Sequence, residues 1–163
     1  MRMDFLTADL CDAFPDRVQV AEPVFRSFGG LATFYGPVET LKVFEDNTLV
    51  RETLETEGRG RVLVVDGGAS TRCALVGGNL AGLAHIHGWA GVVVYGGIRD
   101  TVGIAAIPVG VLALHTVPRK SEKRSTGERG VPVRFAGVTF LPGHYLYADP
   151  DGVITAVENL LVL

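Results

Sequence analysis

Two continuous apolar runs constrain the fold of this 163-residue chain more than any other feature. The first is Arg61–Asp66 and the second is Gly91–Tyr95. Runs of this length without polar alternation are typical of strands that are buried on both faces of a parallel sheet. A glycine-rich loop and a helical segment, Leu80–His87, lie between them, so the sequence predicts a βαβ unit with a right-handed crossover. Ligands of such sheets bind beyond the carboxyl ends of the strands, and the residues that follow the strands are therefore candidates for a site.

The rest of the chain predicts a mixed α/β fold with a β-rich C-terminal half. We expect one helix at Thr7–Phe14, with Thr7 as its N-cap, and a second helix after residue 45, capped by Asp46 or Asn47. Pro118–Gly130 has the composition of a charged surface loop. The remaining expected strands are 32–35, 38–44, 109–117, 131–135, 138–140, 145–148 and 153–156.

Composition bounds the class of protein. With 47% apolar and 20% charged residues and no internal repeat, residues 1–163 are expected to form a single globular domain. A net charge of −3 does not predict the positively charged surface that direct nucleic-acid binding usually requires. No apolar run approaches the roughly 20 residues of a membrane helix, and the N-terminus lacks the apolar core of a signal peptide. Cys11 and Cys73 form no CxxC motif, so we expect free thiols and a cytoplasmic protein.

Arg99–Asp100 is the first candidate site, because it directly follows the second buried run. An arginine presents a rigid fork of donors that matches a carboxylate in bidentate fashion. An adjacent aspartate can give one oxygen ligand to Mg²⁺ or Mn²⁺, with water and substrate completing the coordination shell. Together the two side chains could hold a 2-oxo acid. The alternative, which the dipeptide alone leaves open, is a surface ion pair or a helix-cap aspartate.

The segment Gly77, Gly78, Asn79 and Leu80 is the second candidate, because it lies at the start of the expected helix. Unpaired backbone N–H groups and the positive end of the helix dipole can bind an anion there without a charged side chain. Alone, this segment is equally typical of a plain connection between a strand and a helix. It gains interest because only one helix and one strand separate it from Arg99.

The other polar clusters are weaker candidates for a catalytic or metal site. The four histidines, at positions 85, 87, 115 and 144, have no metal-ligand spacing and are interpreted as structural or surface residues. The segment Arg119–Arg129 has five basic and two acidic residues. It is expected to be a solvated loop, with a positive rim for an acidic substrate or a patch for a partner protein as alternatives.

Eight segments, spread in order over nearly the whole chain, resemble the RraA-like family, named after regulator of ribonuclease activity A. The resemblance implies a β/β/α swivelling-domain fold, assembled as a ring-shaped homotrimer that can pair into a dimer of trimers, with pockets between subunits. The segments are FGG (28–30), VFEDN (43–47), GRVLVVDGG (60–68), ALV (74–76), GVVVYGGIRD (91–100), PRKS (118–121), GVTF (137–140) and YADPDG (147–152).

The family includes metal-dependent aldolases of 4-hydroxy-4-methyl-2-oxoglutarate that also decarboxylate oxaloacetate. The resemblance implies that a divalent cation, Mg²⁺ or Mn²⁺, binds at Asp100 and stabilises a pyruvate enolate. It also implies that Arg99 binds the substrate carboxylate and that the backbone of Gly77–Leu80 meets the substrate. The family's aldolase motif is Asp, twenty residues and then Arg-Asp, but Gly78 stands here in place of that aspartate. We therefore expect decarboxylation of a 2-oxo acid to survive better than aldol cleavage.

The resemblance implies a second function equally well, because family members inhibit an RNase E-type endoribonuclease by direct protein contact. A sensor that binds an oxoacid without turnover is a third, weaker alternative. Some relatives are known as menaquinone-pathway methyltransferases, but the sequence has no glycine-rich loop suited to S-adenosylmethionine. The sequence leaves open the metal, the physiological substrate and the choice between trimer and hexamer.

Overall fold

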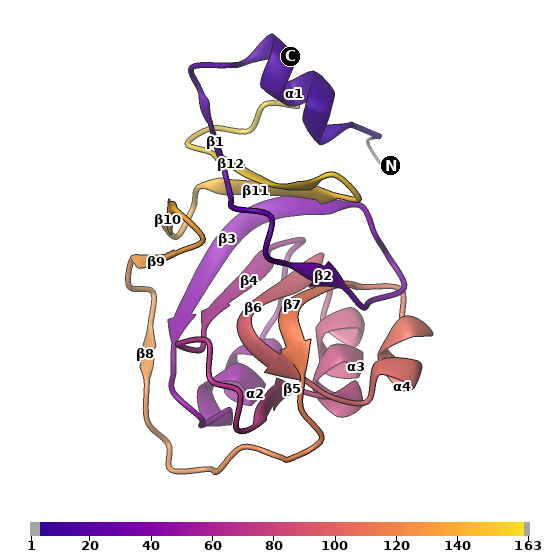
Figure 1. Cartoon of the computed structure of the whole chain (residues 1–163), viewed down its shortest axis with the longest axis vertical. Coiled ribbons are helices and arrows are strands. Elements are labelled where there is room, and N and C mark those ends of the chain that lie inside the picture. The colour runs from indigo at the N-terminus through magenta and orange to yellow at the C-terminus, as the bar shows by residue number, and fades with distance from the viewer. Residues whose placement is uncertain (1–3, 162–163) are drawn as a thin grey trace.

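A computed structural model describes residues 4–161 of the chain, and its centre is a parallel sheet (Figure 1). The strands pair in the order β3-β4-β6-β7, and all three pairings are parallel. This confirms the predicted βαβ unit, since β4 and β6 are the two continuous apolar runs. The bounds are β3 (Phe34–Lys42), β4 (Val62–Asp66), β6 (Gly91–Ile98) and β7 (Gly110–Thr116).

Shorter strands extend this sheet at both edges. The path continues from β3 through β11 and β12 to β1 by antiparallel pairing, and β2 pairs with β7 at the far edge. Off this path, β5 pairs with β6 and β8 pairs with β3, while β9 and β10 form a separate hairpin. The bounds are β1 (Val18–Val20), β2 (Arg26–Ser27), β5 (Ala74–Val76), β8 (Glu128–Arg129), β9 (Val133–Phe135), β10 (Val138–Phe140), β11 (Tyr145–Asp149) and β12 (Gly152–Ala156).

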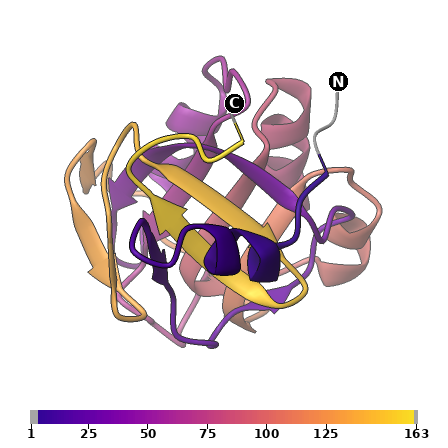
Figure 2. The same cartoon turned by 90° about the horizontal axis from the view of Figure 1, so that it is seen from above.

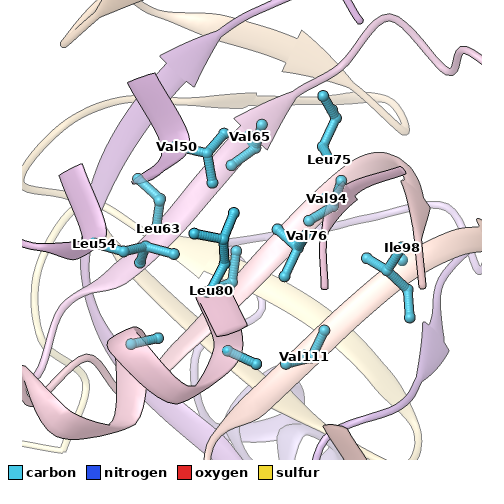
Figure 3. Packing of buried hydrophobic residues seen from close by; sticks show 14 of the residues in the cluster. Val50, Leu54, Leu63, Val65, Leu75, Val76, Leu80, Val94, Ile98 and Val111 are labelled. Carbon is cyan, nitrogen blue, oxygen red and sulfur yellow. The ribbon is translucent and has the colours of Figure 1, made fainter. Parts of the chain in front are cut away.

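Three helices, α2 (Thr48–Leu54), α3 (Gly78–Ile86) and α4 (Thr101–Ala105), cover one face of the parallel strands (Figure 1). Figure 3 shows apolar side chains of α2 and α3 meeting those of β4, β5, β6 and β7 in one buried cluster. Full burial of each such side chain is worth roughly 1.5–3 kcal/mol. This packing fixes the position of each helix start relative to the strand ends.

A second buried cluster lies on the other face of the parallel strands. There β11, β12 and the β9–β10 hairpin pack their apolar side chains against Val62, Val64 and Val93. Helix α1 (Thr7–Ala13) covers the outer side of β11 and β12 in a third cluster (Figure 2). The layering of strands, sheet and helices confirms the predicted α/β class, the β/β/α arrangement and the β-rich C-terminal half.

Several local predictions need correction. Thr7 is not an N-cap, because its N–H and hydroxyl both donate to the Asp149 carboxylate instead. The strands expected at 32–35 and 38–44 form the single strand β3, since pairing with β11 and β4 carries the backbone through Gly36 and Pro37. Elements β1, β2, β5, β8 and α4 were not predicted, because each has five or fewer residues and depends on its pairing partners.

The predicted loop 118–130 is confirmed apart from β8, and both cysteines are free thiols. Within residues 4–161, no helix combines the length and the apolar character needed to cross a membrane.

Candidate functional site

Arg99 and Asp100 emerge at the carboxyl edge of the sheet because the strand before them is buried to its last residue. Strand β6 runs on through both glycines to Ile98, which is fully buried, rather than ending at Tyr95 as predicted. The Arg99 N–H donates to the Val76 carbonyl at 3.0 Å, and its Nη1 donates to the Pro118 carbonyl at 3.4 Å. Arg99 is thereby held half-buried between β5 and the charged loop.

Asp100 turns its carboxylate towards the start of α3. The N–H of Gly78 donates to Asp100 Oδ2 at 3.0 Å. Asp100 stands at the N-cap position of α4 but makes no side-chain capping bond there, and no ion pair joins it to Arg99 within residues 4–161. The alternative of an ion pair between the two residues is therefore not found within residues 4–161, while the alternative of a helix-cap aspartate is found in a different form, because the Asp100 carboxylate accepts from the first residue of α3.

The backbone of Asp100 lies in the left-handed region, with φ of 62° and ψ of 43°. This conformation costs most L-residues about 1–2 kcal/mol relative to the right-handed helix region, and aspartate adopts it more readily than most. Residues held in such conformations cluster at functional sites, where the surrounding structure compensates the strain. At Asp100 the hydrogen bond from Gly78 and the buried end of β6 hold the residue in this conformation.

The two glycines before α3 differ in how tightly they fit. A Cβ at position 77 would lie 2.8 Å from Asp100 Oδ2, a distance that real Cβ atoms do not show. A Cβ at position 78 would lie 3.6 Å from the same oxygen, which is ordinary van der Waals contact. Gly77 is therefore required for the approach of Asp100, whereas position 78 can accept a side chain.

A cavity of about 100 Å³ connects these residues with the charged loop, which was a candidate positive rim, and with the start of α2, which the sequence did not predict as part of a site. Of the two candidate segments, Gly77, Asn79, Leu80, Arg99 and Asp100 line it, whereas Gly78 does not. Apart from Ala74 of β5, the rest of the lining consists of Asn47, Arg51, Lys120, Ser121 and Lys123, which we name the α2–loop wall. Four cationic side chains thus face one carboxylate, which suits an anionic ligand.

Asp46 ties the charged loop to the start of α2. Its Oδ1 accepts hydrogen bonds from the N–H and hydroxyl of Thr48, and its Oδ2 accepts from Arg124 N and from the N–H and hydroxyl of Thr126. Asp46 is 1% exposed. Burial by itself raises the pKa of Asp46, but hydrogen bonds from Thr48 and Thr126 outweigh it and hold the pKa well below the ordinary value. The loop is therefore fixed where it meets the cavity.

The predicted cap of α2 is confirmed in its position, but the side chain that makes the capping hydrogen bond is not that of the N-cap residue. Asn47 occupies the N-cap position without a side-chain capping bond, while Asp46 bonds to the Thr48 N–H from one residue earlier. Among the other polar predictions, His115 Nε2 lies 2.9 Å from the Ser70 carbonyl, which is a structural contact. The charged loop was a candidate positive rim, and Lys120 and Lys123 indeed reach the cavity.

The geometry defines an α/β protein with a small cationic site at the carboxyl edge of a parallel sheet, of a size suited to a small acid. The chain matches the RraA-like family, described as aldolase/RraA, over residues 7–155. It belongs to this family.

Two relatives match over nearly their whole length. A protein of Laribacter hongkongensis (strain HLHK9) is 61% identical, with 98% of this chain and 100% of the relative covered. One of Burkholderia multivorans (strain ATCC 17616 / 249) is 57% identical, with 97% and 99% covered. Both are provisionally named as 4-hydroxy-4-methyl-2-oxoglutarate aldolase.

Two solved structures carry different descriptions. That from Geobacillus kaustophilus HTA426, described as an S-adenosylmethionine:2-dimethylmenaquinone methyltransferase, is 53% identical with a TM-score of 0.95, covering 96% of this chain and 98% of its own. The RNA-processing inhibitor RraA from Thermus thermophilis is 52% identical with a TM-score of 0.92, covering 96% and 94%. The shared fold is therefore compatible with more than one function.

Proposed function

We propose that this chain is a carbon–carbon lyase of small 2-oxo acids, which decarboxylates oxaloacetate and cleaves 4-hydroxy-4-methyl-2-oxoglutarate. The observation that carries the proposal is the arrangement of Arg99 and the left-handed Asp100 against the start of α3. The names of the Laribacter and Burkholderia relatives support the same reaction class. The site residues proposed are Gly77, Gly78, Asn79, Leu80, Arg99 and Asp100.

Binding of the substrate carboxylate falls to Arg99 and to the first turn of α3. The guanidinium offers paired donors in the geometry of a carboxylate. The N–H groups of Asn79 and Leu80 have no acceptor within the helix, because the first turn of every α-helix leaves such donors free. The positive end of the α3 dipole adds to the attraction. These groups orient the 2-oxo acid with its keto oxygen near Asp100.

The oxygen ligands at Asp100 suit Mg²⁺ or Mn²⁺, which keep several water ligands, better than they suit a metal that is coordinated entirely by protein side chains. No group of three or more His, Cys, Asp or Glu side chains suited to a metal occurs in residues 4–161. Asp100 Oδ2 accepts from Gly78 and Oδ1 accepts no hydrogen bond within residues 4–161, so Oδ1 is open to a cation. Mg²⁺ commonly binds through one or two carboxylates and keeps several waters. When bound, such an ion polarises the 2-oxo group as a Lewis acid.

The side chains near the cavity favour decarboxylation over aldol cleavage. Loss of CO₂ from oxaloacetate requires no base, whereas aldol cleavage requires removal of a hydroxyl proton. Gly78 supplies no carboxylate for that proton, and among the described residues Asp100 is the only acidic side chain in the lining. We therefore expect faster decarboxylation than aldol cleavage by the same protein.

Parallel assays of both reactions with Mg²⁺ or Mn²⁺ test this proposal. The expected result is metal-dependent pyruvate release from oxaloacetate, with slower release from 4-hydroxy-4-methyl-2-oxoglutarate. Equal background rates for protein and buffer would overturn the lyase assignment. A faster aldol cleavage would overturn the argument from Gly78 alone.

A second candidate is inhibition of an RNase E-type endoribonuclease by direct contact, without direct binding of nucleic acid. The 52% identity to the RNA-processing inhibitor RraA from Thermus thermophilis favours it. Pull-down with the ribonuclease of the same organism tests this candidate, and Arg99→Ala and Asp100→Ala variants that still inhibit would separate it from catalysis. Failure of the protein to bind that nuclease would remove the candidate.

The proposed assembly is a homotrimer, alone or paired into a hexamer. Sedimentation velocity of the purified protein distinguishes trimer, hexamer and monomer. The proposed compartment is the cytoplasm, for which the two free thiols, Cys11 and Cys73, are the supporting feature.

A further inference from the structure

Decarboxylation of oxaloacetate includes a proton transfer that neither Arg99 nor Asp100 explains. When the bond between C3 and the leaving carboxylate breaks, its electron pair stays on the pyruvate fragment as an enolate, and C3 must then take up a proton. Gly78 supplies no acid for this step. Asp100, the only acidic side chain in the lining among the described residues, accepts a hydrogen bond from Gly78 instead. The proton therefore comes from another group of the cavity or directly from water.

The cationic side chains of the cavity differ in whether they can release a proton. The cavity is lined by two arginines, Arg51 and Arg99, and by two lysines, Lys120 and Lys123. A guanidinium does not lose its proton in proteins, so the arginines are excluded as proton donors. A lysine ammonium can release a proton and take it back, and lysines serve in this way in other active sites. The choice is therefore between Lys120 and Lys123.

Lys120 is anchored to the strand that also carries Arg99. The N–H of Ala74, at the start of β5, donates to the Arg119 carbonyl at 2.8 Å, and Ala74 forms an isolated parallel bridge with Lys120. The Arg99 N–H donates to the last residue of β5, and its guanidinium donates to the Pro118 carbonyl. Lys120 therefore belongs to the end of the cavity where the 2-oxo acid group is expected to bind.

Lys120 also borders a second cavity of about 690 Å³ on the charged loop. Among the described residues it is the only one that lines both cavities, whereas Lys123 lines only the smaller one. The Lys120 residue as a whole is exposed. A proton donor must recover its proton from water after each turnover, and Lys120 has access to water on the side away from the substrate.

No carboxylate of the second cavity holds the Lys120 ammonium away from the site. Its two acidic side chains are Glu45, which pairs with Arg72 at 2.6 Å, and Glu122, which pairs with Arg124. Lys120 itself forms no ion pair within residues 4–161. The ammonium is therefore available to a bound substrate.

We propose that Lys120 is a catalytic residue, which donates a proton from its ammonium to C3 of the pyruvate enolate. The bond between C3 and the carboxylate breaks, CO₂ leaves, and the electron pair remains in the enolate. A C3–H bond then forms with a proton from Nζ, and the neutral amine takes a proton from water. By microscopic reversibility, the same amine removes a proton from C3 of bound pyruvate. This inference rests on the proposed binding of the 2-oxo acid group at Arg99.

Exchange of the pyruvate methyl protons with D₂O tests this step without cleavage of a carbon–carbon bond. Proton NMR in buffer with Mg²⁺ follows the loss of the methyl signal. Wild-type protein should exchange these protons well above the protein-free rate. Lys120→Gln and Lys120→Arg should each lower the exchange rate about 100-fold, as expected for loss of a general acid–base group. The arginine variant keeps the positive charge, so its loss of exchange separates proton transfer from electrostatic binding.

Two further measurements separate proton transfer from a structural role. Lys120→Arg should keep the KM for pyruvate within about threefold and lower only kcat, because charge at this position is retained. Arg119→Gln is the matched control, because it removes a charge from the neighbouring residue, which lines the second cavity but not the site. It should leave the exchange rate within about twofold of the wild type. Full exchange in Lys120→Arg, or a loss found in Lys123→Gln and not in Lys120→Gln, would overturn the proposal.

Exchange and decarboxylation fail independently. Exchange that depends on Lys120, without release of CO₂ from oxaloacetate, would remove the proposed lyase function and retain the proton transfer. Release of CO₂ by the wild type, with exchange no faster than in protein-free buffer, would remove the role of Lys120 and retain the lyase function.

Discussion

Replacement of Asp46 by asparagine tests whether one buried carboxylate holds the charged loop in place. Five donors, from Thr48, Arg124 and Thr126, converge on this side chain. An asparagine amide turns one acceptor oxygen into a donor, and the donors facing it lose their partner. At about 1–3 kcal/mol for each unpaired group, and without full additivity, we expect a loss of about 3–5 kcal/mol of unfolding free energy. For a domain of this size the melting temperature should fall by about 10–15 °C.

The difference in unfolding free energy between the wild type and Asp46→Asn should depend on pH. The pKa of Asp46 in the folded protein lies below its value of about 3.9 in the unfolded chain, so the carboxylate contributes its full stability above that value. Its contribution is lost as the pH falls towards the folded pKa. Each pH unit below about 3.9 should narrow the gap between wild type and Asp46→Asn by about 1.4 kcal/mol.

Urea unfolding at pH 7 and pH 3 measures this gap. It should be about 1 kcal/mol smaller at pH 3 than at pH 7. Asp16→Asn is the matched control, because Asp16 is exposed and makes no side-chain hydrogen bond or ion pair in the described part of the chain. The control should change stability by less than about 0.5 kcal/mol at both pH values. A gap that stays constant or widens at pH 3 would refute the reasoning.

Three further predictions concern the site itself. Arg99→Lys should lower kcat/KM for oxaloacetate about 10- to 100-fold with little change in melting temperature, because an ammonium cannot reproduce the paired donors; an unchanged kcat/KM contradicts this. Gly77→Ala places a Cβ against Asp100 Oδ2 and should lower metal-dependent decarboxylation at least about tenfold, whereas wild-type activity would show that Asp100 need not lie there. Gly78→Asp should fold normally, bind Mg²⁺ more tightly by calorimetry and raise the ratio of aldol cleavage to decarboxylation; weaker Mg²⁺ binding argues against a cation at this position.

The sequence predicted the part of the site that follows from sheet topology. The buried runs ending at Asp66 and Tyr95 imply parallel strands, and parallel strands place the residues after them at one edge. For this reason Arg99 and Asp100 could be expected near Gly77–Leu80 before any coordinates were known. The hydrogen bond from the Gly78 N–H to Asp100 shows that the two segments do lie next to each other.

The α2–loop wall could not be predicted in the same way, because its members come from distant parts of the chain. The local sequence predicts only a helix cap at Asn47, and Ser121 is one of several polar residues in a charged loop. Their proximity depends on Asp46, whose hydrogen bonds to Arg124 and Thr126 cross from the start of α2 to the loop. Such long-range contacts leave no periodic pattern in the sequence. The left-handed conformation of Asp100 could not be predicted either, because aspartates adopt it in many turns and no sequence pattern marks it.

The most direct test of the central claim is the initial rate of oxaloacetate decarboxylation by purified protein with Mg²⁺, with and without EDTA. The account predicts a rate well above the protein-free background that EDTA abolishes. It also predicts that Arg99→Ala and Asp100→Asn return the rate to background while their melting temperatures stay near that of the wild type. A wild-type rate equal to the protein-free rate, or full activity in both folded variants, would contradict it.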